Sequence, residues 1–500
     1  MKKHTFSLAF IFFITLVFAE NPGVSQVVPD FWIESSSDSA FHNFPAIGVD
    51  KEGNFVVVWT TTIDIDSQFS TTEIWGRLYR NDGSPLTPKF RINDKEMYGE
   101  GAPMLPTSID VNNAGNFIIT WGLSVIYFQQ YNSYAEPQGN NIQIKAVTSG
   151  EYPAVGMDRS GNFTIAWANW YTPRGIYAQR FGSEGDSLGI ALRINQPYHE
   201  EIWNPAIAMN EAGDFIIVWK KGRYGEEGIH GQLFKNDGTA EGANFKISDD
   251  TDSAYHGNAA VAIDSSGDIF AVVWQDNRLG DYNLYCQLYR DGEAHGTNFI
   301  VNEEDNDSTS WFVPAIAMDK SGCFVITWAD NRSGTNDIYG QCYDSSGKVI
   351  GKNFIVNTEQ EGNQGHPAVA LKNGYIFNTW TDGSIWANII EFPDLSGFKD
   401  ENKPPETLYQ FKLFPNYPNP FNSSTSITFV LKEEVNVIIK IFNILGKETI
   451  TLVNEIQPAG YRSVIWDGTD HYGNPVSSGV YLCIMTAGDF TELQKMLLMK

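Results

Sequence analysis

Four arginines occupy one repeated position in the chain and are well placed to bind an anion. Arg174, Arg223, Arg278 and Arg332 are each followed within two residues by Gly, and the last two belong to Asp-Asn-Arg runs. A guanidinium group can hold a carboxylate or a phosphate through two parallel hydrogen bonds. The four arginines could therefore form an anion-binding cluster, or each could pair with an acidic group of its own or the next repeat and fix a loop.

Aromatic side chains and histidines gather just before a second repeated element. They are His42, Phe44, Tyr152, Trp203, Tyr255, His256, Trp311, Phe312 and His366. Sugar rings bind to aromatic faces that have amides and carboxylates nearby. The same side chains could instead fill gaps between neighbouring sheets. As candidate binding residues we select Trp203, Trp311, His256 and His366, together with the four arginines.

Two acidic runs could ligate Ca²⁺, which prefers oxygen ligands. They are Asp249-Asp250-Thr251-Asp252 and the run at residues 303–307. Acidic runs that face solvent need no metal, so both interpretations stay open. The four cysteines, Cys286, Cys323, Cys342 and Cys483, are too few and too scattered for a disulfide framework, although Cys323 and Cys342 could be neighbours within one repeat. A zinc site would need closely spaced ligands, and none is seen. We predict no cofactor, with Ca²⁺ as the one candidate ion.

No catalytic constellation is evident in the sequence. Glycoside hydrolysis requires two carboxylates at a defined separation, and Asp276, Asp330 and Asp382 occupy one repeat-equivalent place, two residues after a Trp. Such repetition favours a structural role over a catalytic one. The Ser-x-Asp-x-Gly-x-x-Trp box of sialidase-type enzymes, a Ser-His-Asp arrangement, a phosphate-binding loop and a His-Glu-x-x-His motif are not found.

These side chains must be positioned by a repeated unit, which is best seen in residues 314–357. The unit contains four β-rich runs, and hairpin chemistry of the type Asp-x-x-Gly joins the first two. Its Trp recurs at intervals of about fifty residues, which is the period of a propeller blade. The seven copies are marked by Trp59, Trp121, Trp167, Trp219, Trp274, Trp328 and Trp380. We therefore predict an all-β chain with a seven-bladed β-propeller.

The seventh copy lacks a fourth strand, and a replacement is found at the other end of the propeller. Phe31–Glu34 precedes the first copy and matches the fourth-strand pattern. We predict that it completes the last blade, so that the propeller spans residues 31–392 without an exposed edge. In such a meander the second-to-third and fourth-to-first connections share one face. We call it the loop face and expect it to carry the function; the Asp-x-x-Gly turns lie on the opposite turn face.

The N-terminal segment and the charge predict an exported protein. Residues 1–19 combine Lys2 and Lys3, an apolar run and Ala19, as in a secretory signal peptide. No other stretch is long and apolar enough to suggest a transmembrane span. The formal net charge of −26 argues against non-specific binding to nucleic acid or to an anionic membrane.

Residues 411–500 follow a polar, proline-containing linker at 393–410 and show strand patterns at the spacing of a small β-sandwich. The run LFPNYPNPFNSST from Leu413, Trp466-Asp467-Gly468, Ser478-Gly479-Val480-Tyr481 and the final KMLLMK resemble the C-terminal sorting domain of the type IX secretion system. The segment is also similar to the Ig-like domain of flagellar-hook capping proteins. This resemblance implies an Ig-like domain that partners the secretion machinery of a diderm bacterium. The propeller units look like repeats of bacterial exoproteins, which implies no particular activity.

We expect a secreted or cell-surface bacterial protein whose non-catalytic propeller binds a glycan or an extracellular protein. The alternative is a secreted glycan-cleaving enzyme of the glycoside hydrolase type, with carboxylates drawn from Asp276, Asp330, Asp382 and the neighbouring acidic loops. The two hypotheses differ in whether two of these carboxylates lie about 5 to 10 Å apart in an open pocket.

Overall fold

A computed structural model gives the fold of most of the chain. It describes residues 25–36, 40–64, 69–94, 97–100, 106–145, 150–169, 173–195, 202–222, 228–250, 254–302, 313–358, 362–391, 411–414, 416, 419–422, 424–432, 435–457 and 460–499. Regular structure in these ranges consists of β-strands. Within them, no helix is long and apolar enough to cross a membrane. The predicted all-β fold is confirmed, whereas the predicted signal peptide and linker lie outside the described residues.

The first four sheets come from the N-terminal half of the chain and keep sequence order from the axis outward. One contains β2 (Ala40–Val49), β3 (Phe55–Asp64), β4 (Phe69–Tyr79) and β5 (Phe90–Arg91), with β6 (Met97–Glu100) paired to β4. The next contains β7 (Ser108–Val111), β8 (Phe117–Leu123), β9 (Val125–Tyr131) and β10 (Ile142–Gln143). The third contains β11 (Gly150–Met157), β12 (Phe163–Asn169), β13 (Gly175–Phe181) and β14 (Leu192–Arg193). The fourth contains β15 (Ile202–Met209), β16 (Phe215–Lys221), β17 (Gly228–Phe234) and β18 (Ala240–Lys246).

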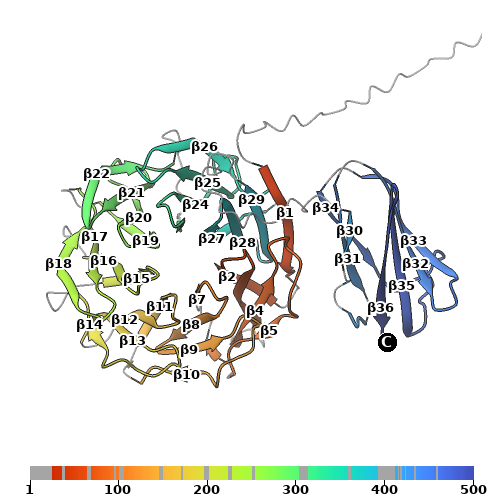
Figure 1. Ribbon diagram of the computed structural model, residues 1–500, viewed down its shortest axis with the longest axis horizontal. Coiled ribbons are helices and arrows are strands. Elements are labelled where there is room, and N and C mark those ends of the chain that lie inside the picture. Colours follow the sequence, from red (N-terminus) through yellow and green to blue (C-terminus); the bar gives the residue numbers. More distant parts are fainter. Residues whose placement is uncertain are drawn as a thin grey trace, which may run out of the picture.

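Three more sheets complete the ring that Figure 1 shows around a common axis. The fifth contains β19 (His256–Ile263), β20 (Ile269–Asp276), β21 (Asn283–Arg290) and β22 (Glu293–Ile300). The sixth contains β23 (Ala315–Met318), β24 (Phe324–Asp330), β25 (Asp337–Tyr343) and β26 (Val349–Ile355). The seventh contains β27 (Gly365–Lys372), β28 (Tyr375–Thr381), β29 (Ile385–Glu391) and β1 (Ser25–Glu34). This is a propeller architecture, and we number the blades by these sheets.

The Asp-x-x-Gly turns are built by their own side chains. In blade 6, Asp319 Oδ1 accepts the backbone N–H groups of Ser321 at 2.8 Å and of Cys323 at 3.1 Å. Gly322 then takes a φ of +84°, a left-handed conformation that costs glycine little. The sequence therefore specifies a tight hairpin, in which the aspartate carboxylate accepts hydrogen bonds from the backbone of its own turn.

The hydrophobic core lies between the blades rather than in one central mass. The repeated tryptophan of every blade is at most 1% exposed. Trp328 of β24, for example, belongs to a cluster that also holds Val273 of β20 and Leu284 of β21 in the preceding blade. The apolar face of each blade is thus buried only when the neighbouring blade is present. This explains why the repeats must close into a ring.

The N-terminal strand occupies the outer position of blade 7. Antiparallel pairing runs from Ser25 opposite Glu391 to Glu34 opposite Ile385, so β1 begins earlier than the Phe31–Glu34 pattern indicated. Val28 and Ile33 of this strand are buried in the core between blades 7 and 1. The first and last parts of the propeller are therefore held together by main-chain hydrogen bonds and by apolar packing.

The fourth strands of blades 1 to 3 are shorter than their sequence patterns indicated. β5, β10 and β14 contain two residues each, whereas β18, β22 and β26 contain seven or eight. In blades 1 and 2 the start of the strand is reduced to an isolated bridge at Pro85 and at Pro137. Blade 3 has the same isolated bridge at Ser187, so the shortening does not depend on proline.

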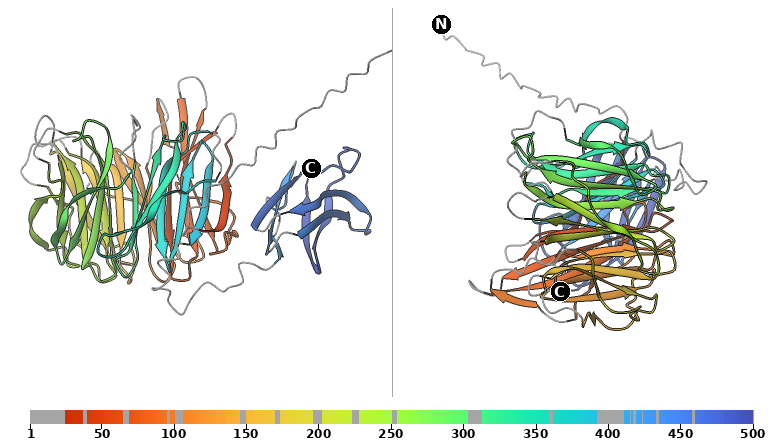
Figure 2. Two further views of the ribbon diagram at one scale, coloured as in Figure 1. Left: turned by 90° about the horizontal axis from the view of Figure 1, so that it is seen from above. Right: turned by 90° about the vertical axis from the view of Figure 1, so that its left-hand side faces the viewer.

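The described residues after 410 form two antiparallel sheets. One contains β30 (Lys412–Leu413), β31 (Thr425–Leu431) and β34 (Gly460–Trp466). The other contains β32 (Val435–Asn443), β33 (Glu448–Gln457), β35 (Gly479–Ala487) and β36 (Phe490–Leu498). Both sheets contribute to one hydrophobic core around Trp466, which is separate from the clusters of the propeller. Figure 2 shows the strands of this part from two further directions.

Candidate functional site

Arg278 turns back onto its own blade instead of facing solvent. Its Nε and Nη2 atoms donate to Asp276 Oδ2 at 2.9 and 2.6 Å, and Asp249 accepts from Nη1. The guanidinium carbon lies 4.2 Å from the centre of the Tyr285 ring, within cation–π distance. Trp274 Nε1 also donates to Asp276 Oδ2, at 3.1 Å.

Arg332 repeats this arrangement in the next blade. Its Nε and Nη2 atoms lie 3.1 and 2.6 Å from Asp330 Oδ2, and its guanidinium carbon lies 4.3 Å from the Tyr339 ring centre. Trp328 Nε1 donates to the same carboxylate oxygen at 3.1 Å. The Asp-Asn-Arg run is therefore a recurring device that ties the loop to the repeated tryptophan. For Arg278 and Arg332, this geometry fits the interpretation in which the arginine fixes its own loop.

Neither Asp276 nor Asp330 is available to a substrate, because both are completely buried. Burial alone would raise the pKa of Asp276, but hydrogen bonds from His256 and Arg278 outweigh it and hold that pKa well below the usual range. Such a carboxylate stays ionised and cannot act as a general acid at physiological pH. These two residues therefore do not meet the requirement for a pair of carboxylates in an open pocket.

His256, which we selected as a binding residue, is also completely buried. Its Nε2 atom lies 3.1 Å from Asp250 Oδ1 and 3.3 Å from Asp276 Oδ2. The register of the strands explains this burial, because His256 pairs with Asp276 at the end of β20. This burial favours the alternative in which the side chain fills space within the protein over direct contact with a ligand. His42 stands at the equivalent place of blade 1, pairs with Thr61 and is buried too.

A metal ion does not fit this histidine cluster well. The possible ligand atoms of Asp250, His256 and Asp276 lie within 4.8 Å of one another. However, the N–H groups of Arg278 and Trp274 already point at the Asp276 oxygen that a metal would need. We interpret the cluster as a hydrogen-bonded support for the loop.

Four residues of the innermost strands, near the loop face, take a left-handed backbone conformation. Phe44, Tyr152, Asn204 and His366 each precede a proline and have φ values of +48°, +53°, +44° and +47°. A left-handed conformation is unfavourable for Phe44 and Tyr152, whereas Asn and His adopt it more readily, and such strain is often stored where a ligand is held. A register shift marks each site, as between Glu151 and Ala154.

Neighbouring members of this set contact one another around the axis. The rings of Phe44 and His366 have centroids 4.6 Å apart although they belong to blades 1 and 7. Asn204 donates to Asn258 of the next blade. Tyr152 keeps 39% of its surface exposed. We call Phe44, Tyr152, Asn204, Asn258 and His366 the axial mouth. It offers aromatic faces and amides side by side, as sugar and peptide ligands require.

The other predicted residues have varied surroundings. Trp203 of β15 is half-buried and Arg174 is exposed. Arg223, Trp311 and the acidic run at 303–307 lie outside the described residues. Asp249 accepts from Arg278 and from the backbone N–H of Asn298, so this part of the other acidic run is engaged within the protein. Among the described candidate binding residues, His366 belongs to the axial mouth, where it meets Phe44 of the wider aromatic set.

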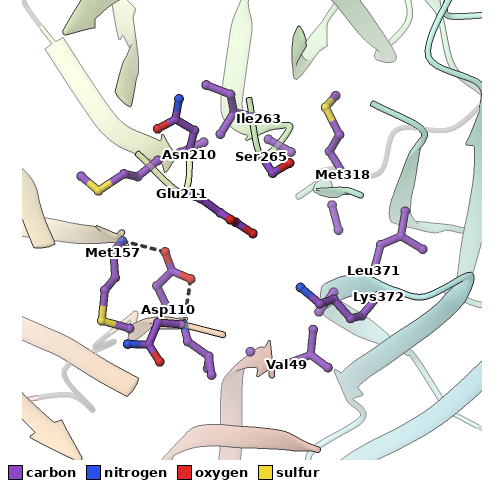
Figure 3. Close-up of a pocket in the computed structure, with 18 of the residues that line it drawn as sticks. Val49, Asp110, Met157, Asn210, Glu211, Ile263, Ser265, Met318, Leu371 and Lys372 are labelled. Atoms are coloured by element: carbon purple, nitrogen blue, oxygen red, sulfur yellow. Dashed lines mark hydrogen bonds between the residues drawn. The ribbon is translucent and has the colours of Figure 1, made fainter. Parts of the chain in front are cut away.

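The sequence interpretation missed a cavity on the axis toward the turn face. It has a volume of about 380 Å³ and is lined by the innermost strands of the propeller sheets described above. Figure 3 shows Asp110, Glu211 and Lys372 around it. One signal could have revealed it, because Asp110 breaks a pattern of small residues at equivalent places. The others are Gly48, Gly156, Ala208, Ala262, Ala317 and Ala370.

No protein-family model and no curated protein matches the chain. Solved structures with related shapes are distant. A protein of unknown function from Dyadobacter fermentans is 12% identical, with a TM-score of 0.44 over 74% of this chain and 100% of that one. An ulvan lyase of polysaccharide lyase family 25 is 8% identical, with a TM-score of 0.47 over 71% and 94%. PorZ, a surface component of the type IX secretion system of Porphyromonas gingivalis, is 11% identical, with a TM-score of 0.31 over 91% and 81%. At these scores the likenesses carry no argument about function.

Proposed function

We propose that this protein is an exported bacterial binding protein whose propeller recognises a glycan or an extracellular protein without cleaving it. The observation that carries the proposal is the state of Asp276 and Asp330. Both carboxylates are buried and saturated by tryptophan and arginine donors of their own blades. The loop face therefore offers well-supported loops without a free pair of catalytic carboxylates among these residues.

The ligand would contact the axial mouth and the loops around it. Tyr152 and Trp203 supply aromatic surface, Asn204 and Asn258 supply amides, and Arg174 supplies an exposed positive charge. Aromatic stacking with hydrogen bonds from amides suits sugar rings and extended peptides. Arg278 and Arg332 would act indirectly, by holding their loops in place. No cofactor is required in this proposal, and Ca²⁺ is included in the test as an added ion.

The domain organisation proposed here assigns delivery and binding to different parts of the chain. Residues 31–392 are a seven-bladed propeller closed by the N-terminal strand, which the seven described sheets and the β1–β29 pairing support. Residues 411–500 are an Ig-like sorting domain, which the two sheets and their separate core support. Residues 1–19 are a signal peptide and 393–410 a linker. The mature chain would be secreted or held at the surface of a diderm bacterium.

A binding screen of the mature full-length chain against glycans and extracellular proteins, with and without Ca²⁺, tests the binding proposal. For a hit, we expect Tyr152→Ala and Trp203→Ala to weaken binding at least tenfold without lowering the thermal midpoint. Tyr134→Ala is the matched control, because Tyr134 is 76% exposed in a turn on the opposite face. Equal losses in Tyr134→Ala and Tyr152→Ala, or none in either, would place the site elsewhere.

A further inference from the structure

The axial cavity on the turn face is large enough for a small molecule. Its volume of about 380 Å³ lies within the range of roughly 300 to 1,000 Å³ that ligand pockets occupy. The walls are the second halves of the innermost strands, and the starts of the Asp-x-x-Gly turns form the rim. The cavity is therefore distinct from the axial mouth, which lies at the other end of the same strands.

Asp110 is a charged side chain at a place where six blades have Gly or Ala. Its two carboxylate oxygens accept the backbone N–H groups of Val111 and of Met157 in the next blade, both at 2.8 Å. The place is crowded, since a Cβ atom at the equivalent Gly48 would clash with Val111. Burial raises the pKa of Asp110 to about 6. A carboxylate here thus costs free energy that the same fold avoids in its other blades.

A second set of polar groups crosses the cavity between blades that are not neighbours. Lys372 Nζ of blade 7 donates to Asn113 Oδ1 of blade 2 at 3.2 Å. Asn113 Nδ2 in turn donates to Glu211 Oε1 of blade 4 at 2.8 Å. Figure 3 shows Glu211 and Lys372 extending toward each other across the space beside Asp110. The cavity therefore has two carboxylates toward one side and an ammonium group toward the other.

We propose that the axial cavity binds a small molecule that presents a protonated amine to Asp110 and Glu211 and a hydroxyl or carboxylate oxygen to Lys372. The protonated amine would lie between the carboxylates of Asp110 and Glu211 and interact with both. Lys372 would keep its hydrogen bond to Asn113 and donate a second one to the ligand. A bare metal cation fits less well, because it offers no oxygen for the Lys372 ammonium group that faces the same space.

The probes are two pairs of compounds that differ in the amine. D-glucosamine is compared with D-glucose, and L-alanine with L-lactate, by calorimetric titration of the full chain at pH 7.5. We expect one amine to bind at least tenfold more tightly than its partner, and which pair responds distinguishes an amino sugar from an amino acid. Equal binding within both pairs, or no binding of any probe, would overturn the proposal.

Variants separate a ligand site from a purely structural tie between blades. Glu211→Gln keeps an acceptor for Asn113 but removes the charge, and Asp110→Asn keeps one acceptor oxygen for a backbone N–H. Both should lose at least tenfold in affinity for the amine, at an unchanged thermal midpoint for Glu211→Gln. Tyr152→Ala should bind the amine normally, so this result is independent of the loop face. Full affinity in Glu211→Gln and Asp110→Asn would contradict the assignment.

Discussion

Asp330 and Asp382 stand at equivalent places of blades 6 and 7 but in opposite surroundings. Asp330 is buried and accepts from Trp328 and Arg332, whereas Asp382 is exposed and accepts from the backbone N–H of Ser384 at 2.9 Å. We predict that Asp330→Ala lowers the free energy of unfolding by about 3 to 5 kcal/mol, because it leaves a partly buried guanidinium without its carboxylate.

The matched control is Asp382→Ala, for which we expect a loss below about 1 kcal/mol. Urea unfolding of the full-length chain measures both variants. Equal and small losses would mean that the Asp-Arg-Trp device does not support its loop, and the structural interpretation of Asp276 would lose its basis as well.

The raised pKa of Asp110 leads to a prediction about how stability depends on pH. Its pKa is raised to about 6, above the value of an unfolded chain, so the folded state binds this proton more tightly. The contribution of this carboxylate to stability is therefore least favourable above pH 6 and improves as the pH falls from about 6 toward 4. Relative to Asp110→Asn, the wild-type chain should gain roughly 2 kcal/mol of stability between pH 7 and pH 4. Parallel stability curves for the two proteins would contradict the burial of this charge.

At the scale of the strand, β1 makes its own prediction. It contributes the buried side chains of Val27, Val28 and Ile33 and pairs with β29 along its length. Removing residues 20–36 exposes this apolar surface and the edge of β29, which costs several kcal/mol. We expect the thermal midpoint of the propeller to fall by about 10 °C or more. Calorimetry of the shortened chain measures this, and an unchanged midpoint would refute closure by the N-terminal strand.

The strands and hairpins could be predicted from the sequence where the same local motif recurs in successive repeats. The tryptophans and the Asp-x-x-Gly turns specify strands and hairpins from neighbouring residues alone, and the missing fourth strand was visible by comparing copies. The two-residue strands β5, β10 and β14 were not foreseen, because the apolar pattern of the fourth strand is the same in blades with short and with long strands.

The site was harder to predict because it depends on convergence at the axis. His256 lies in a loop-like stretch of sequence, yet its register with Asp276 buries it. Glu211 and Lys372 are far in sequence from Asp110 and Asn113 and from each other, and they meet only because the ring brings their strands together. The sequence of a single repeat does not indicate these contacts between blades. What the sequence does show is the departure of Asp110 from the small residues at equivalent places.

At the scale of the whole molecule, the proposed sorting domain makes a prediction about delivery. The sandwich formed after residue 410 has its own core around Trp466, so its removal should leave the propeller folded. We expect deletion of residues 411–500 to retain the propeller in the periplasm, with an unchanged melting profile for that part. Fractionation of cells measures the location. Undiminished delivery to the outer surface or the medium would refute the sorting role.

Prolonged incubation of the full-length chain with a ligand from the binding screen, followed by mass spectrometry of that ligand, tests directly whether the loop face binds without cleaving. Because Asp276 and Asp330 are buried and fully hydrogen-bonded, we expect saturable binding that depends on Tyr152 and an intact ligand after many hours. Steady release of cleavage products, abolished by replacing a carboxylate of the loop face in a variant that still folds, would contradict the proposed function.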